Sequence, residues 1–393
     1  MSERIEANFN HELLIWARES IDLELEEAAK KIGIKTERLQ DWESGNKKPT
    51  IIQLRKAASV YKRALAVFFL SEVPKTFDVM KDFRRLAEIG ELKRSPHLLL
   101  EIRRSQYRRE VALEVLHDME EEFPPLEFHI SITDNPENIA HKIRELLGIS
   151  YEVQSRWRNS YEAFNSWKKA IENLNILVFH TSQTSRIEIE EMRGFSISEN
   201  IFPAIVINSK DRPNGKLFTL LHELVHLVLH NGGICDLKEH YSVDTENQKT
   251  EIFCNHVSGA TLVPMEFLLK NKIVIDKGTA KTWTDIELSN LASEFSVSRE
   301  VILRRLLIAD KTTEEFYAEK REEFQQYYQK SLETDREGFP PYYRMVIRNN
   351  GEYFIKMILN AYYQDLISSS QLSDFIGAKL SHLPEIEQAL SRT

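Results

Sequence analysis

The spacing of apolar residues over the first seventy or so positions predicts a bundle of short helices. Apolar side chains recur at helical intervals in residues 13–17, 25–32, 39–42 and 54–61. Gly33 follows the second stretch and is placed to end it, because glycine adopts left-handed backbone angles without strain. Short helices joined by a tight glycine turn are typical of a helix-turn-helix module.

The middle of the chain combines further helical patterns with short apolar runs. Helical spacing covers residues 75–125, 134–148 and 161–173. Runs rich in β-branched and aromatic residues predict strands at 176–179, 192–197 and 204–208. A small sheet is therefore expected immediately before the strongly apolar segment that surrounds His222.

The C-terminal third is predicted to be helical throughout. Residues 285–308 form two helical patterns joined by a tight turn, which fits either a second DNA-reading unit or a structural pair. We favour the structural role because few basic residues precede Arg299. Residues 312–338 predict a polar helix or linker, and residues 342–390 predict amphipathic helices without evident chemistry.

Arginines cluster in the long helical pattern of residues 75–125, at Arg103, Arg104, Arg108 and Arg109. Glu101 and Glu110 stand within helical reach of them, which favours a solvated face carrying ion pairs between neighbouring turns. A supporting role in phosphate contact is the alternative.

Composition describes an ordinary water-soluble protein rather than a polycation. Of the 393 residues, 42% are hydrophobic and 29% charged, with a formal net charge of -9, so DNA contact requires a local basic patch. The length suggests two or three domains. Two cysteines, Cys235 and Cys254, argue against a disulfide framework. No apolar run has membrane-spanning length and no signal peptide is visible, so we expect a cytoplasmic protein without a membrane partner.

Residues 219–230 contain the pattern H-E-x-x-H in almost entirely apolar surroundings. Residues four apart share one face of a helix, so His222 and His226 can direct two imidazoles at one point, beside Glu223. A helix that is apolar all round is expected to be buried, where these polar groups need partners. A Zn²⁺ ion would be such a partner, and H-E-x-x-H is the metallopeptidase arrangement. The alternative is a core helix whose histidines hydrogen-bond to the backbone.

A catalytic zinc site needs a third protein ligand and one open position. Glu251 is the best candidate because it begins an apolar helical run that can fold back against the first helix. Asn255, four residues later, shares its face and is expected to hold a ligand in place. Three other histidines are weaker candidates: His230, His240 and His256. Three ligands from one straight helix cannot surround an ion, which argues against His230.

The N-terminal region contains the string Ala28-Ala29-Lys30-Lys31-Ile32-Gly33-Ile34, followed by Trp42-Glu43-Ser44-Gly45 and Pro49-Thr50. This region resembles the XRE (lambda-repressor-like) helix-turn-helix family. The resemblance implies that residues 24–48 dock on double-stranded DNA with the third helix in the major groove. The residues implied to contact DNA are Lys35, Thr36, Arg38, Gln40, Asn46, Lys47 and Lys48. Glu37 and Asp41 lie on the same helix, so a module for protein contact or homodimer formation is the alternative.

The segment around the H-E-x-x-H pattern is Phe218-Thr219-Leu220-Leu221-His222-Glu223-Leu224-Val225-His226, and it is followed by Glu251-x-x-Cys254-Asn255 and Leu262-Val263-Pro264. This part of the chain resembles the ImmA/IrrE metallopeptidases. Cys254 stands where that family usually has alanine, and Val225 where it often has glycine. The resemblance implies a zincin-like core and cleavage of repressor-like or antitoxin-like proteins, including toxin–antitoxin settings. A helix-turn-helix ahead of such a peptidase is also familiar in that family.

These patterns and resemblances predict a mostly helical α+β protein in four parts. Residues 1–74 are expected to form the helix-turn-helix domain and 75–174 a helical connecting region. Residues 175–311 are expected to form the zincin-like peptidase domain with its small sheet, followed by a helical C-terminal region at 312–393.

The expected function is that of a zinc-dependent regulatory endopeptidase. Glu223 would act as general base on a water held by His222, His226 and Glu251. The strand that precedes the active helix, at residues 205–208, would hold an extended protein substrate by strand addition. Two alternatives stay open: a DNA-binding regulator or toxin–antitoxin component whose peptidase fold serves mainly binding, and a fold in which zinc is only structural.

Overall fold

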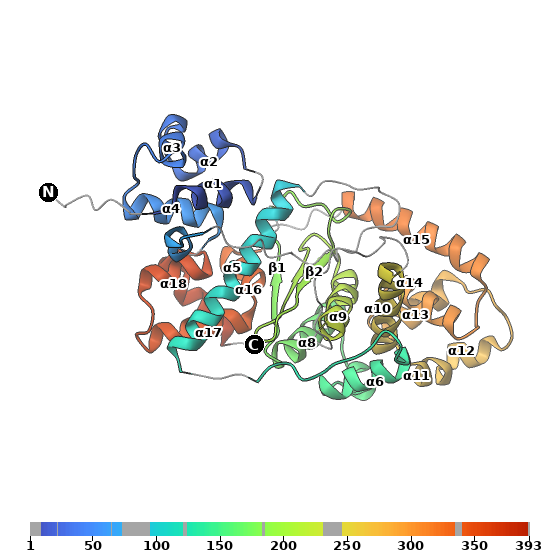
Figure 1. The fold of residues 1–393 in the computed structure, drawn as a ribbon. Helices are drawn as coiled ribbons and strands as arrows, with labels where there is room; N and C mark the ends of the chain where they lie inside the picture. Colours follow the sequence, from blue (N-terminus) through green and yellow to red (C-terminus); the bar gives the residue numbers. More distant parts are fainter. Residues whose placement is uncertain are drawn as a thin grey trace.

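The computed structural model describes residues 9–21, 23–63, 65–72, 95–120, 124–182, 185–230, 246–334 and 340–391. It confirms a mostly helical α+β protein with one three-stranded sheet (Figure 1). Separate hydrophobic cores lie within the N-terminal helices and on each face of the sheet. Within the described ranges, no helix combines the length and the apolar character needed to cross a membrane.

The sheet contains β1 (Leu177–His180), β2 (Gly194–Ile197) and β3 (Ala204–Ile207) in the order β1-β3-β2. β1 lies parallel to β3, and β2 lies antiparallel to it. Both faces of the sheet are covered, which explains why the strands appear in the sequence as continuous apolar runs. The expectation that the strand at residues 205–208 holds substrate is wrong, because β3 is central and both of its edges are already paired.

One face of the sheet, with Val178, Ile205 and Ile207, packs against α8 (Ser160–Glu172) and α9 (Pro213–His230). Further helices complete this core: α6 (Pro136–Leu146), α7 (Tyr151–Gln154), α10 (Glu246–Leu262), α11 (Met265–Lys270), α12 (Lys272–Lys277), α13 (Asp285–Glu294), α14 (Arg299–Ile308) and α15 (Glu314–Thr334). The helices α13 and α14 bury their apolar residues here, which agrees with the structural role favoured for them.

The opposite face of the sheet, with Phe179, Phe195 and Val206, packs against α5 (Pro96–Asp118) and the C-terminal helices. These are α16 (Tyr342–Asn350), α17 (Glu352–Tyr363), α18 (Ser369–Ile376), the short η2 (Leu380–His382) and α19 (Leu383–Leu390). Gly351 joins α16 to α17 at a φ of 79°, and a Cβ there would lie 2.6 Å from the Val178 carbonyl oxygen. The close packing of the C-terminal helices on β1 therefore requires glycine.

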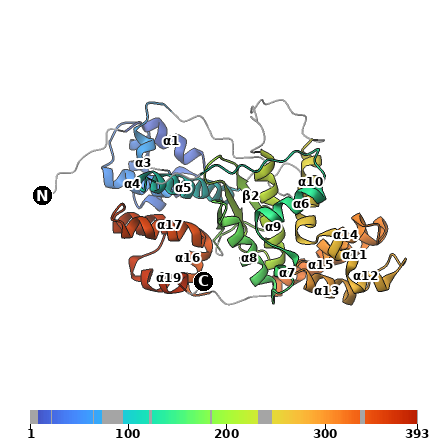
Figure 2. The same cartoon turned by 90° about the horizontal axis from the view of Figure 1, so that it is seen from below.

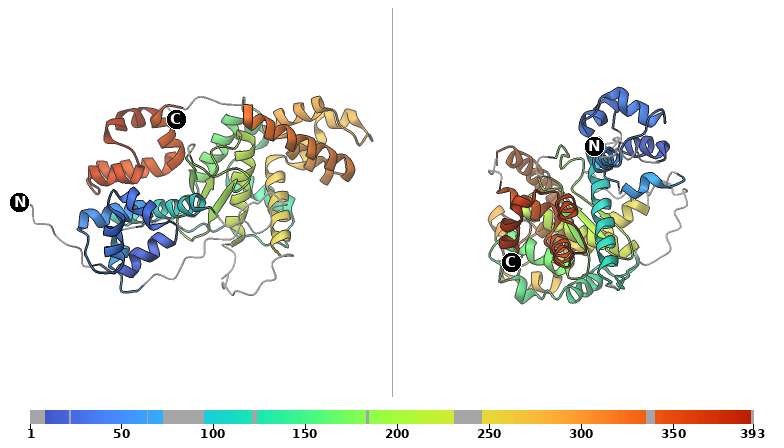
Figure 3. Two further views of the ribbon diagram at one scale, coloured as in Figure 1. Left: turned by 90° about the horizontal axis from the view of Figure 1, so that it is seen from above. Right: turned by 90° about the vertical axis from the view of Figure 1, so that its left-hand side faces the viewer.

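The N-terminal domain contains α1 (His11–Glu19), α2 (Leu25–Ile32), α3 (Thr36–Glu43), α4 (Ile51–Tyr61) and η1 (Leu65–Phe69) around its own core. Gly33 ends α2 in the left-handed conformation, as the sequence predicted, and Thr50 begins α4 with a capping box. Figures 2 and 3 show these helices at the same end of the molecule as the C-terminal helices, with α5 running from them toward the sheet.

Arg103 and Arg108 of α5 do not lie on the solvated face that the sequence predicted for them. The ion pairs with Glu101 and Glu110 are present, but only 5% of Arg103 and 2% of Arg108 is exposed. Arg103 donates to the Lys62 carbonyl of the N-terminal domain, and Arg108 donates to the Asn349 carbonyl of α16. The prediction failed because α5 lies between three parts of the protein, which no local pattern reveals.

Candidate metal centre

The helix α9 begins at Pro213, a residue tolerated in the first turn because that turn needs no amide donor. Its apolar residues pack against α8, α10 and the sheet, so the polar groups of the H-E-x-x-H pattern are enclosed. His222 and Glu223 have no exposed surface and His226 has 1%. Such groups are stable in a core only when other polar groups or an ion compensate them.

The two imidazoles and the Glu251 carboxylate meet at one point. Nε2 of His222 lies 3.0 Å from Nε2 of His226. Oε2 of Glu251 lies 3.2 Å from Nε2 of His222, and Oε1 lies 3.2 Å from Nε2 of His226. The histidines come from one face of α9, and the glutamate comes from α10, which packs against it. These ligand atoms all lie within 4.8 Å of one another.

The charges at this point favour a cation. Burial by itself raises the pKa of Glu251, but hydrogen bonds to His222 and His226 outweigh it and hold the pKa well below its usual range. Burial lowers the pKa of His226, while hydrogen bonds to Cys254 and Glu251 raise it well above normal overall. The cluster thus already attracts positive charge, and two imidazole nitrogens with one carboxylate form a donor set found in catalytic zinc sites. The residues present fit such an ion.

Glu223 lies where α9 contacts β2. The Ser196 hydroxyl of β2 donates a hydrogen bond of 3.0 Å to Oε2 of Glu223. Gly194 allows this approach, because a Cβ there would lie 2.4 Å from Cγ2 of Thr219 and 3.0 Å from the Val206 carbonyl oxygen. Ser196 could not be predicted from the sequence, because its contact with Glu223 depends on how β2 lies beside α9.

Comparison with known families agrees with this arrangement. Residues 171–307 match the family described as the IrrE N-terminal-like domain of peptidase family M78, and residues 14–68 match a helix-turn-helix family. The chain carries an IrrE N-terminal-like domain. Its matched range includes the whole sheet, the His222 helix and Glu251, and the helix-turn-helix precedes it. No curated protein matches the chain significantly.

The residues near Glu251 on α10 have different surroundings. Within the described ranges, Oδ1 of Asn255 is buried without a hydrogen-bond partner, so its role beside a ligand stays a prediction. Cys254, the preceding residue, hydrogen-bonds to His226, as Glu251 does. His256 turns away to Glu137 on α6, at 2.9 Å. His240 and the side chain of His230 lie outside the described residues.

In the helix-turn-helix domain ahead of the IrrE-like domain, the predicted DNA-contacting residues lie on the surface. Thr36 is half-buried, and the others are exposed: Lys35, Arg38, Gln40, Asn46, Lys47 and Lys48. Lys47 forms a 2.6 Å ion pair with Asp41, which offsets part of the positive charge. Figure 1 shows α3 on the outer side of this domain, facing away from the sheet.

Proposed function

We propose that this protein is a zinc-dependent endopeptidase that cleaves a repressor-like or antitoxin-like protein. The observation that supports it most directly is the meeting of His222, His226 and Glu251 at one point, with both histidines and the adjacent Glu223 buried. Catalytic zinc sites are held by three protein ligands, and these three residues would supply that number. The substrate class follows from the family resemblance rather than from the geometry of the site.

The residues of the chain have separate tasks in this proposal. His222, His226 and Glu251 would hold a Zn²⁺ ion, which would supply Lewis-acid activation of water and of the scissile carbonyl. Glu223 accepts the proton of that water and later delivers it to the leaving amine nitrogen. Ser196 holds Oε2 of Glu223, so the carboxylate keeps a fixed orientation.

The edge strand β2 is the part of the sheet that fits an extended substrate. One edge of β2 pairs with β3, and within the described ranges no strand pairs with the other edge. Because β2 also carries Ser196, a segment added along this edge would pass close to Glu223. We assign substrate positioning to β2, in place of the strand at residues 205–208.

The helix-turn-helix is proposed to dock the enzyme on DNA or on a DNA-bound partner. The exposure of α3 on the outer side of its domain supports this role. The second candidate function is a DNA-binding regulator or toxin–antitoxin component in which the peptidase fold serves binding, and the same exposed helix favours it. The two functions differ in whether Glu223 is needed.

Metal analysis of the purified chain is the primary test. We expect about one zinc per wild-type chain and a zinc affinity at least roughly 100-fold weaker in Glu251→Ala, since even residues behind the ligands contribute about 10–100-fold. Glu319→Ala removes an exposed glutamate of α15 and is the matched control. Zinc retained by Glu251→Ala would reject the proposed ligand set.

A second test separates proteolysis from binding. Cells that express the wild-type chain or Glu223→Gln are compared by labelling of new protein N-termini. We expect cleavage products that occur only with the wild-type chain, while both proteins bind zinc equally. Identical N-termini and an unchanged biological effect would reject proteolysis and favour the binding function.

A further inference from the structure

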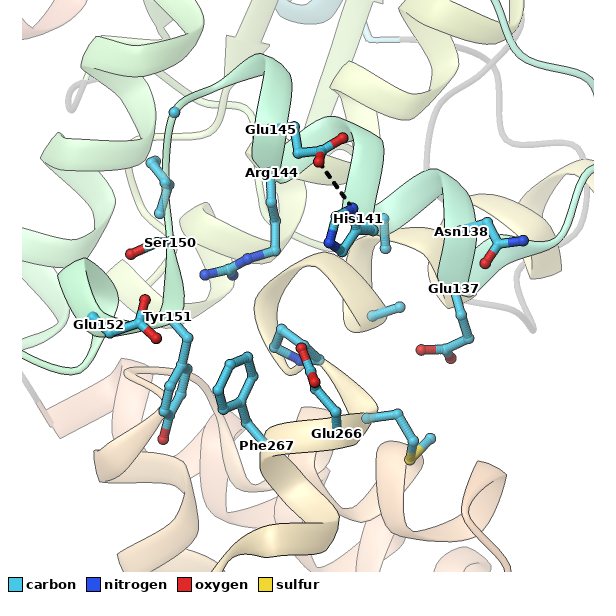
Figure 4. A pocket seen from close by; sticks show the side chains of 16 residues that line it. Glu137, Asn138, His141, Arg144, Glu145, Ser150, Tyr151, Glu152, Glu266 and Phe267 are labelled. Atoms are coloured by element: carbon cyan, nitrogen blue, oxygen red, sulfur yellow. Dashed lines mark ion pairs between the residues drawn. The ribbon is translucent and has the colours of Figure 1, made fainter.

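A cavity of about 660 Å³ lies away from the metal centre, between α6, α7, α11 and the C-terminal end of α10 (Figure 4). Ala260 lines it, nine positions after Glu251 on α10. Nine residues of α-helix correspond to about 14 Å and two and a half turns, so the cavity and the metal centre lie on opposite faces of α10. A volume of this size is typical of small-molecule sites.

Arg144 contributes the main positive charge in this cavity. Only 8% of its surface is exposed, and its Nη1 donates to Oε1 of Gln154 and to the Thr261 carbonyl, both at 2.7 Å. Nη2 has no acceptor among the described residues. Burial lowers the pKa of Arg144 to about 10, so it remains charged at neutral pH. A buried cation with an unused donor is stabilised by an anionic acceptor.

The walls of the cavity are apolar and fixed in position. The rings of Tyr151 and Phe267 stack with centroids 4.0 Å apart, and the Tyr151 hydroxyl donates to Glu294. Ile149, Pro264 and Met265 extend this surface. Figure 4 shows the Arg144 side chain extending from α6 toward Tyr151 and Phe267. An occupant therefore needs an anionic group near Arg144 and an apolar body beside the two rings.

Carboxylates at the rim of the cavity disfavour a ligand that carries only negative charge. Glu137 and Glu145 line the cavity but are paired, with Arg305 and with His141. Glu152 is close enough to Arg144 to act on its charge, and Glu266 is an exposed carboxylate on the side formed by α11. Neighbouring groups of opposite charge, such as Arg144 and Glu152, match a ligand whose own anion and cation are adjacent.

We propose that this cavity binds a free α-amino acid with a large apolar side chain. Its carboxylate accepts from the Arg144 guanidinium, its ammonium group faces Glu152 or Glu266, and its side chain packs against Tyr151 and Phe267. Because α10 also carries Glu251, the site is placed to act as an effector site for the metal centre. The binding itself does not depend on the peptidase function and is tested without an activity assay.

The test uses 4-fluoro-L-phenylalanine with the purified full chain, observed by ligand-detected ¹⁹F NMR. Two matched derivatives each lack one charge: the amide has no carboxylate, and the N-acetyl compound has no ammonium group. We expect the parent compound to bind and each derivative to bind at least about tenfold more weakly, the effect of one charged hydrogen bond. No binding of the parent at millimolar concentration, or equal binding of all three, would overturn the proposal.

Substitutions in the cavity test whether the ligand binds there. Arg144→Gln is expected to weaken it at least about tenfold, while Arg158→Gln, an exposed arginine nearby, is expected to leave it unchanged. Arg144→Gln also loses contacts to Gln154 and Thr261, so Met265→Trp fills the cavity by a second route and is expected to abolish binding with the zinc content unchanged. Full binding by a folded Met265→Trp chain would place the ligand elsewhere and reject this site.

Discussion

The Ser196 hydroxyl donates a 3.0 Å hydrogen bond to Oε2 of Glu223, joining the edge strand β2 to the helix that carries both histidines. Only 3% of Ser196 is exposed, so bulk water cannot readily replace this bond. A fixed carboxylate transfers a proton more effectively than one that must first be oriented. The bond therefore connects the position of the sheet to the chemistry proposed for Glu223.

Ser196→Ala is predicted to lower kcat about tenfold without removing the metal, because Glu223 loses its fixed orientation but the three ligands are untouched. Ser196→Thr keeps a hydroxyl and is expected to retain most of the activity. Cleavage of the substrate identified by N-terminal labelling gives kcat and KM, and elemental analysis gives zinc content. A fall in zinc content equal to the fall in kcat would contradict a positioning role.

Gly194→Ala is predicted to destabilise the fold by about 1–3 kcal/mol, since the new Cβ would lie 2.4 Å from Cγ2 of Thr219. Both residues are part of the contact between β2 and α9, so neither can move away freely. Combining the change with Thr219→Ser removes the clashing methyl group and is expected to restore part of the stability. Urea unfolding of the single and double variants measures this, and an equally unstable double variant would contradict the steric cause.

The ionised Glu137 carboxylate is predicted to stabilise the fold, and this contribution is lost in acid. Partial burial raises its pKa, but hydrogen bonds from His256 and Arg305 outweigh this and lower it from 4.5 to about 2. The unfolded chain therefore takes up this proton first as pH falls, so the stabilisation is complete above about pH 4.5 and is lost toward pH 2. The side chain is 35% exposed, and after allowance for solvent screening the contribution is about 1–2 kcal/mol.

Glu137→Gln tests this by removing the titrating group. Arg305 has no exposed surface, so the variant is expected to be less stable than wild type near neutral pH, where the arginine loses its anion. The difference in free energy of unfolding should shrink as pH falls below about 4, where the wild-type carboxylate becomes protonated. A difference that stays constant across this range would contradict the assignment.

Lys35 and Arg38 are predicted to carry the DNA contact of the N-terminal domain. Both are exposed on or beside α3, while the charge of Lys47 is partly offset by Asp41. The double change to alanine is expected to weaken duplex DNA binding and to reduce the slope of log affinity against log salt by about 2, if each residue neutralises one phosphate. The double change of Arg55 and Lys56 to alanine removes two exposed charges from α4, outside residues 24–48, and is the control. An unchanged slope would favour the protein-contact role of this module.

Features that depend on neighbouring residues could be predicted from the sequence. The spacing of His222 and His226 places both imidazoles on one face whenever that segment is helical. Gly33 ends α2 and Thr50 begins α4 because helix ends follow local backbone preferences. Glu251 was identified by a mixture of helical pattern and family resemblance, and its meeting with the histidines required α10 to pack against α9.

Features that depend on what packs against a segment could not be predicted in this way. Arg103 and Arg108 look like members of a solvated helix face, because their glutamate partners lie in neighbouring turns of the same helix. Their burial arises from three distant segments that close around α5. The strand at residues 205–208 likewise gives no sign that it lies in the middle of the sheet, since strand order is a property of topology.

By itself, the amino-acid sequence determined the helical segments, the placing of two imidazoles on one helix face, and the resemblance of two parts of the chain to known families. Only the tertiary structure decided that Ser196 reaches Glu223, that β2 rather than β3 has an edge without a strand partner in the described ranges, and that Arg144 lines a separate cavity. The reason is physical: helical spacing is set by bonds within a few residues, whereas burial, register and cavities depend on contacts between segments far apart in the chain.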